Sequence, residues 1–223
     1  MSGTPARLWF GGTALLVLIA LVTQFVVLLT GPGLVNPNST TALFRAINMF
    51  AYFTILSNTI VGVTSLLLAL NPYRRSTVFR VFRLMGLVAI TITFIVYGLA
   101  LAHLLDLDSW AYFSDVLLHR IVPVVAVLGW LIYGPRGLTS PRIAALTMLL
   151  PAGYMVFALI RGAIDRWYPY PFADVNSLGY GRVIVNAFWI SVLFFAFAMG
   201  AHALNQALPR RGVGEQPPAP ASS

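Results

Sequence analysis

Six long apolar stretches constrain this chain more than any other feature of its sequence. Each is long enough to cross about 30 Å of hydrocarbon as a helix that rises about 1.5 Å per residue. Gly and Pro residues punctuate the breaks between the stretches. The predicted fold class is therefore all-α, a polytopic membrane protein with a bundle of about six transmembrane helices. Their approximate ranges are 8–30, 44–70, 84–105, 116–133, 143–160 and 183–204.

Composition supports the membrane interpretation. Only 9% of the 223 residues are charged and 59% are hydrophobic. A soluble domain carries roughly a quarter charged residues, because water must wet its surface. The length suits one transmembrane domain over residues 1–208. The proline-rich segment 209–223 is expected to be a disordered cytoplasmic tail. The first apolar stretch is too long for the core of a signal peptide, so we expect an uncleaved helix.

The charged and reactive residue types exclude several chemistries. All fourteen basic residues are arginine, and the formal net charge is +8. Without lysine the chain cannot form a Schiff base, so it is not a retinal protein. Without cysteine it has no disulfide, thiolate-bound metal or thiol nucleophile. Because the arginines lie between apolar runs, we expect membrane lipids and no nucleic acid as partners. We also expect no cofactor.

The arginines also predict an orientation. Nine of the fourteen lie before the first stretch, in the second and fourth loops or in the tail. The third loop, residues 106–115, holds three acids and no arginine. The positive-inside rule then places both termini in the cytoplasm of a multi-pass plasma-membrane protein. The arginines on the cytoplasmic side are Arg7, Arg74, Arg75, Arg80, Arg83, Arg136, Arg142, Arg210 and Arg211.

Two pairs of polar residues, one within the second apolar stretch and one at the start of the fourth, need an explanation, because polar groups are costly in hydrocarbon. Thr54 and Asn58 lie four residues apart and share one helix face, as do Asp115 and His119. The first pair fits either hydrogen bonding between helices or a reactive site. The second fits either an anchor at the membrane interface, supported by the neighbouring Arg120, or a carboxylate that orients an imidazole.

A third feature is the aromatic fifth loop. Its six residues form either an aromatic belt at the interface or, because two X-Pro steps stiffen it, a lid over the bundle. They are Trp167, Tyr168, Pro169, Tyr170, Pro171 and Phe172. With the predicted orientation, this loop and both polar pairs fall in the outer half of the bundle.

These features together suggest an intramembrane hydrolase. A hydroxyl nucleophile needs a base within hydrogen-bond reach. Thr54 is the candidate nucleophile and His119 the candidate base, provided that their helices touch. Asn58 is the candidate donor to the oxyanion, and Asp115 the candidate that orients the histidine. The substrate would enter laterally from the bilayer.

A family resemblance falls on the same places. The segments YFTILSN (52–58), LLHRIVPVVAVLGWLIYGPRG (117–137) and RWYPYPFADVNSLGYGR (166–182) resemble the bacterial Pr6Pr family of membrane proteins. More remotely, their order resembles the androgen-induced and androgen-dependent transmembrane threonine hydrolases, which cleave fatty-acid esters of hydroxy fatty acids. The resemblance implies a nucleophile at Thr54, a base at His119 and a lipid or fatty-acid ester as the substrate. It also implies that the Trp-x-Tyr-Pro-Phe-like loop corresponds to part of residues 167–172.

Two other functions remain open from sequence. His103, Asp106, Asp115 and His119 flank one short loop, and such a set could bind a divalent metal ion. His202 lies on the opposite side and cannot join them. The other alternative is a non-enzymatic membrane protein, either a small transporter or an accessory protein, with Tyr97 and Asn186 along a path.

Overall fold

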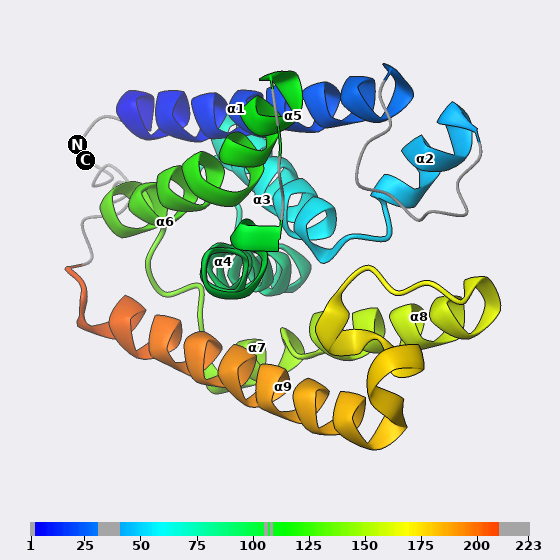
Figure 1. Ribbon diagram of the computed structural model, residues 1–223. Coiled ribbons are helices and arrows are strands. Elements are labelled where there is room, and N and C mark those ends of the chain that lie inside the picture. The colour runs from blue at the N-terminus through cyan, green and yellow to red at the C-terminus, as the bar shows by residue number, and fades with distance from the viewer. Residues whose placement is uncertain (1–2, 31–40, 105–106, 108, 210–223) are drawn as a thin grey trace, which may run out of the picture.

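The computed structural model describes residues 3–30, 41–104, 107 and 109–209. Within these residues the chain forms helices and no β-strand (Figure 1). The prediction of an all-α fold is confirmed. The α-helices are α1 (Gly3–Thr30), α2 (Ala42–Met49), α3 (Phe53–Leu70), α4 (Thr77–Val96), α5 (Ser109–Val116), α6 (Val122–Tyr133), α7 (Pro141–Leu146), α8 (Leu149–Asp165) and α9 (Val175–Ala207).

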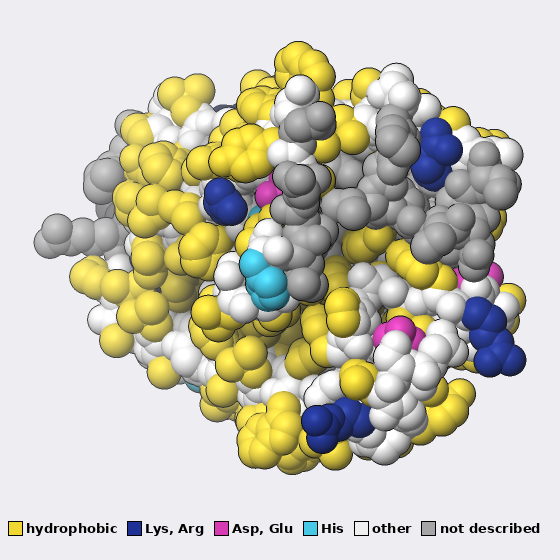
Figure 2. Space-filling model, viewed as in Figure 1, with side chains coloured by type: hydrophobic (Ala, Val, Ile, Leu, Met, Phe, Trp, Pro, Cys, Tyr) yellow, Lys and Arg dark blue, Asp and Glu magenta, His cyan; other side chains and the backbone are white. Residues whose placement is uncertain are grey.

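Several of these helices join into longer rods. Helix α4 continues through a π-helical turn, η1 (Tyr97–Leu101), and a second π-helical turn, η3 (Leu117–Ile121), joins α5 to α6. In the described part of the chain, six helical segments have the length and apolar composition needed to cross a membrane. They are Gly3–Thr30, Phe53–Leu70, Thr77–Leu101, Ser109–Tyr133, Pro141–Asp165 and Val175–Ala207. Hydrophobic side chains cover most of the face shown in Figure 2, as a surface in contact with lipid requires.

Helix α4 is the centre of the bundle. It is seen end-on in Figure 1, with α3, α6, α7 and α9 arranged around it. One buried cluster joins α4 to α7 and α9, and includes Val88, Ile92 and Phe194. The start of α1 and the end of α9 lie on the same side in Figure 1, as an even number of crossings requires.

The predicted second stretch, 44–70, is wrong as a single helix. The structure divides it into α2 and α3, with Tyr52 in an extended conformation between them. No proline or glycine marks this break, so its cause is tertiary. Tyr154 on α8 donates a 2.8 Å hydrogen bond to the carbonyl of Ala51, and Arg161 on α8 donates to the side chain of Asn48.

The other boundaries differ by smaller amounts. Helix α4 begins at Thr77, seven residues before the predicted start at residue 84, so Arg80 and Arg83 lie on a helix and not in a loop. Ser76 caps this helix by accepting a hydrogen bond from the amide of Phe79. The predicted tail lies outside the described residues from residue 210 onward.

Candidate active site

Thr54 lies in the first turn of α3 and is buried, with 8% of its surface exposed. Its Oγ1 is 3.2 Å from Nε2 of His119. The two residues are 65 positions apart in the sequence, and the contact between α3 and η3 brings them together. The structure therefore places the candidate nucleophile within hydrogen-bond reach of the candidate base.

Asp115 lies on the other side of the same imidazole. Its Oδ1 is 2.9 Å from Nδ1 of His119, one helical turn along the chain. The backbone carbonyl of Asp115 lies 3.2 Å from the same nitrogen. Both oxygens accept a proton on Nδ1, and this tautomer leaves the lone pair of Nε2 directed toward Thr54. Thr54, His119 and Asp115 thus form the arrangement of a nucleophile, base and orienting carboxylate.

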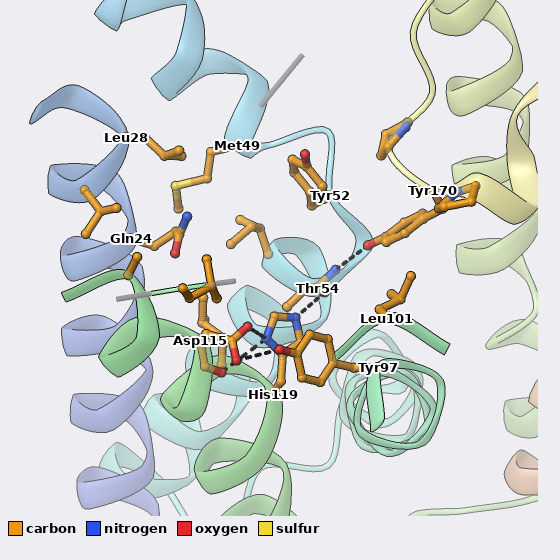
Figure 3. A pocket seen from close by; sticks show the side chains of 17 residues that line it. Gln24, Leu28, Met49, Tyr52, Thr54, Tyr97, Leu101, Asp115, His119 and Tyr170 are labelled. Atoms are coloured by element: carbon orange, nitrogen blue, oxygen red, sulfur yellow. Dashed lines mark hydrogen bonds and ion pairs between the residues drawn. The ribbon is translucent and has the colours of Figure 1, made fainter. Parts of the chain in front are cut away.

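Tyr97 completes this arrangement and was not predicted as part of it. Its hydroxyl donates a 2.6 Å hydrogen bond to Oδ2 of Asp115, the carboxylate oxygen that His119 does not use. Its ring also stacks on the imidazole, with 3.8 Å between ring centroids (Figure 3). Tyr97 therefore holds both the carboxylate and the histidine in place. In the sequence, the only indication of this role is that Tyr97 is a tyrosine within an apolar stretch.

Both supporting helices are locally widened where they contribute to the site. Tyr97 begins η1, and His119 lies in the middle of η3. Such π-helical turns are rare and often occur at functional sites. Pro123 gives a physical reason for η3, because it has no amide hydrogen to donate to the carbonyl of His119 and its ring crowds that carbonyl.

The aromatic loop reaches the site through Tyr170. The hydroxyl oxygen of Tyr170 accepts a 3.4 Å hydrogen bond from the amide of Thr54. Burial raises the pKa of this phenol above its ordinary value, so it stays protonated at neutral pH. Phe172 stacks on the Tyr170 ring, and Asn186 on α9 donates to the carbonyl of Phe172.

The rest of the loop is anchored on α8 and beside α3. The ring of Trp167 lies 5.1 Å from the guanidinium of Arg161, and Tyr168 packs against Gly162. Pro169 and Pro171 join Tyr170 in the wall of the cavity beside Thr54. The loop thus lies at the site, as its prediction as a lid requires.

Two cavities meet at Thr54. The larger has a volume of about 270 Å³ and extends toward α1, α2 and α5, while the smaller, of about 70 Å³, extends toward α8 and α9. Thr54, Tyr97, Leu101 and Tyr170 line both of them. Figure 3 shows the larger cavity, with Thr54, His119 and Asp115 together on one side. Apart from these and a few other polar groups, the walls are apolar.

Asn58 has a different position from the one expected of an oxyanion donor. It is fully buried and lines neither cavity beside Thr54. Its Nδ2 donates to the carbonyl of Thr54 at 2.8 Å and to that of Leu118 at 3.1 Å. Asn58 therefore joins α3 to the turn that carries His119, which is the helix-packing alternative considered from sequence.

The structure offers little support for the metal-site and transport alternatives. Among the described residues, no three His, Asp or Glu side chains gather closely enough to hold a metal ion, and Asp106 lies outside these residues. His103 is exposed. His202 lies at the far end of α9, where it contacts Thr139. Asn186 is held by the aromatic loop and lines neither cavity.

The chain was also compared with protein families, curated proteins and solved structures. None of the three comparisons finds a match. Any function must therefore be argued from the geometry of the site and from the motif resemblance.

Proposed function

We propose that this integral membrane protein is an intramembrane hydrolase in which Thr54 is the nucleophile and His119 the base. One observation carries the proposal: Oγ1 of Thr54 is 3.2 Å from Nε2 of His119, whose Nδ1 is 2.9 Å from the Asp115 carboxylate. A pair that only joined two helices would not require a carboxylate behind the imidazole or a cavity in front of the hydroxyl. The assignment agrees with the motif resemblance to membrane threonine hydrolases.

The reaction follows from the order of the three groups. His119 takes the proton of Thr54 as Oγ1 attacks the ester carbonyl, and Asp115 stabilises the imidazolium that forms. The tetrahedral intermediate collapses when the ester C–O bond breaks, and His119 returns the proton to the alcohol that leaves. His119 then takes a proton from a water molecule as its oxygen attacks the acyl carbon. The bond from that carbon to Oγ1 of Thr54 breaks, the acid leaves, and His119 returns the proton to Oγ1.

Tyr170 replaces Asn58 as the proposed donor to the oxyanion. Its hydroxyl oxygen already accepts the amide proton of Thr54, so the phenol lies beside that residue and its own proton can stabilise negative charge there. The raised pKa of Tyr170 keeps that proton in place at neutral pH. Asn58 cannot donate to an oxyanion at Thr54, because both of its amide hydrogens already go to backbone carbonyls.

The cavities suggest the class of substrate. An ester carbonyl placed at Thr54 would direct one chain into the larger cavity and the other into the smaller one. The mostly apolar walls favour hydrocarbon over sugar or peptide. A lipid or fatty-acid ester that enters from the bilayer fits both features.

Activity-based labelling tests the nucleophile. We expect a fluorophosphonate probe to label the detergent-purified protein on the peptide that contains Thr54, and both Thr54→Ala and His119→Ala to lose the label. Thr59→Ala is a matched control, because Thr59 lies on the same helix and its hydroxyl bonds only to the carbonyl of Ile55. Label that persists in Thr54→Ala, or that disappears equally in Thr59→Ala, would overturn the proposal.

A further inference from the structure

A second buried polar site lies far from Thr54, at the amino-terminal end of α4. Arg83 is six residues into this helix, about 9 Å along its axis, and only 5% of its surface is exposed. Its Nη1 donates to two neutral hydroxyls, Oγ1 of Thr64 at 3.4 Å and Oγ of Ser65 at 3.2 Å. The ring of Phe10 lies 5.2 Å from the guanidinium carbon. None of these groups carries a negative charge.

Among the described residues, the remaining donors of Arg83 have no acceptor. Its Nε and Nη2 are both buried without a hydrogen-bond partner. Asn205 on α9 is 4% exposed, and its Nδ2 is likewise buried without a hydrogen-bond partner among the described residues. Its Oδ1 accepts from the amide of Gly137 at 3.1 Å and from Thr139 at 3.3 Å, and these contacts fix which end of the amide is the donor.

Arg83 and Asn205 line the same small cavity. Its volume is about 10 Å³, which is room for a single occupant of about the size of a water molecule. Arg80 also lines it and directs its Nε to the carbonyl of Leu138. The other lining residues are Leu84, Leu87, Trp130, Pro135, Leu138 and Thr139.

No carboxylate of the described residues lines this cavity. The three described acids are at other places and have their own partners. Asp115 contacts His119, Asp165 contacts Arg161, and Asp174 caps α9. A buried guanidinium without a counter-charge is strongly unfavourable, more so in a helix that crosses hydrocarbon. A water molecule would fill the space but leave the charge uncompensated.

We propose that this cavity binds one small monovalent anion of the chloride type, held by Nε or Nη2 of Arg83 and by Nδ2 of Asn205. The unpartnered groups are donors, as an anion requires, whereas water also needs acceptors for its own protons. A phosphate group is too large for the space. The anion stabilises the place where α3, α4, α9 and the loop after α6 meet. This site is independent of the proposed chemistry at Thr54.

Thermal unfolding of the full chain in neutral detergent tests this proposal. At constant ionic strength, we expect chloride or bromide in place of gluconate to raise the Tm. The increase should grow with the logarithm of anion concentration once binding saturates. Phosphate acts only by its general salt effect, so any change in Tm that it causes should be the same in the wild type and in Arg83→Gln. In crystals grown with bromide, an anomalous peak should lie between Arg83 and Asn205.

Three variants separate a specific site from a general salt effect. Arg142→Gln removes one positive charge from an exposed position and should keep the full response to chloride. Arg83→Gln should lose it. Asn205→Asp keeps the acceptor for Gly137 and places a carboxylate beside the guanidinium, so we expect a high Tm in gluconate and no response to chloride.

Several results would overturn the proposal. One is a wild-type Tm that does not respond to chloride at constant ionic strength. Another is a response to phosphate that Arg83→Gln loses. The third is a response to chloride that Arg142→Gln loses to the same extent as Arg83→Gln. If Arg83→Gln does not fold, Asn205→Asp still tests the proposal. A chloride response in Asn205→Asp as large as that of the wild type would show that the anion does not bind at this cavity. Labelling at Thr54 is a separate measurement and does not affect this outcome.

Discussion

Gly162 on α8 offers a sharp test of how the aromatic loop is held. A Cβ atom added there would lie 2.0 Å from Cε1 of Tyr168. Ordinary van der Waals contact begins at 3.4 Å, so in Gly162→Ala the ring must move by about 1.4 Å, the difference between the two distances. Tyr168 is 9% exposed and has little room for this movement. Because Tyr170 is two residues further on, its contact with Thr54 should be displaced as well.

The energetic balance can be estimated. Overpacking a filled site typically costs about 1–3 kcal/mol. Replacing glycine by alanine within a helix returns up to about 1 kcal/mol. We therefore expect Gly162→Ala to lower the free energy of unfolding by about 1–2 kcal/mol. Gly153→Ala, on the same helix, meets no atom within 4 Å and should instead raise it by about 0.5–1 kcal/mol.

Two measurements in detergent check this reasoning. The Tm should fall in Gly162→Ala and stay equal or rise in Gly153→Ala. The rate of fluorophosphonate labelling should fall only in Gly162→Ala, since only that change displaces Tyr170. If Gly162→Ala is as stable as the wild type and is labelled at the same rate, the loop is not held against α8 as described.

Two further predictions concern the tyrosines of the site. Tyr97→Phe keeps the ring stack on His119 but removes the hydrogen bond to Asp115. We expect labelling at Thr54 to slow about tenfold and the free energy of unfolding to fall by about 1–3 kcal/mol, because a buried carboxylate oxygen loses its donor. An unchanged labelling rate would show that Tyr97 does not position the carboxylate. Burial raises the pKa of Tyr170, so above about pH 10 the unfolded chain loses this proton while the folded chain keeps it. Stability should therefore fall as pH rises there, by at most about 1.4 kcal/mol per pH unit for this group, and Tyr170→Phe should have a shallower dependence of Tm on pH between 9 and 11.

The fold was largely predictable because the bilayer imposes one length scale on every crossing. Apolar length alone placed the carboxyl end of each helical segment to within about five residues, whereas the amino ends differ by up to about nine. It failed at the break between α2 and α3, which depends on hydrogen bonds from Tyr154 and Arg161 far along the chain. It also failed to place Arg83 on α4, because the burial of an arginine depends on its neighbours in space.

The site was predictable to the extent that its members share a helix. Spacing of four residues linked Asp115 to His119, and the structure gives that pair a direct contact. The contact between Thr54 and His119 joins two helices, and neither spacing nor composition determines which helices touch. Spacing also linked Asn58 to Thr54, but the Asn58 side chain bonds to backbone carbonyls and not to the cavity. Tyr97 was overlooked as a site residue because its partners are distant in sequence.

The two π-helical turns that carry Tyr97 and His119 amount to one extra residue in each of two otherwise regular rods. Because each wide turn absorbs its extra residue locally, the helix on either side keeps its apolar face toward the bundle. Removing that residue would restore the α-helical repeat and narrow the turn, which would move Tyr97 or His119 away from the position it holds in the site. A single-residue deletion there would therefore damage the site more than the bundle around it.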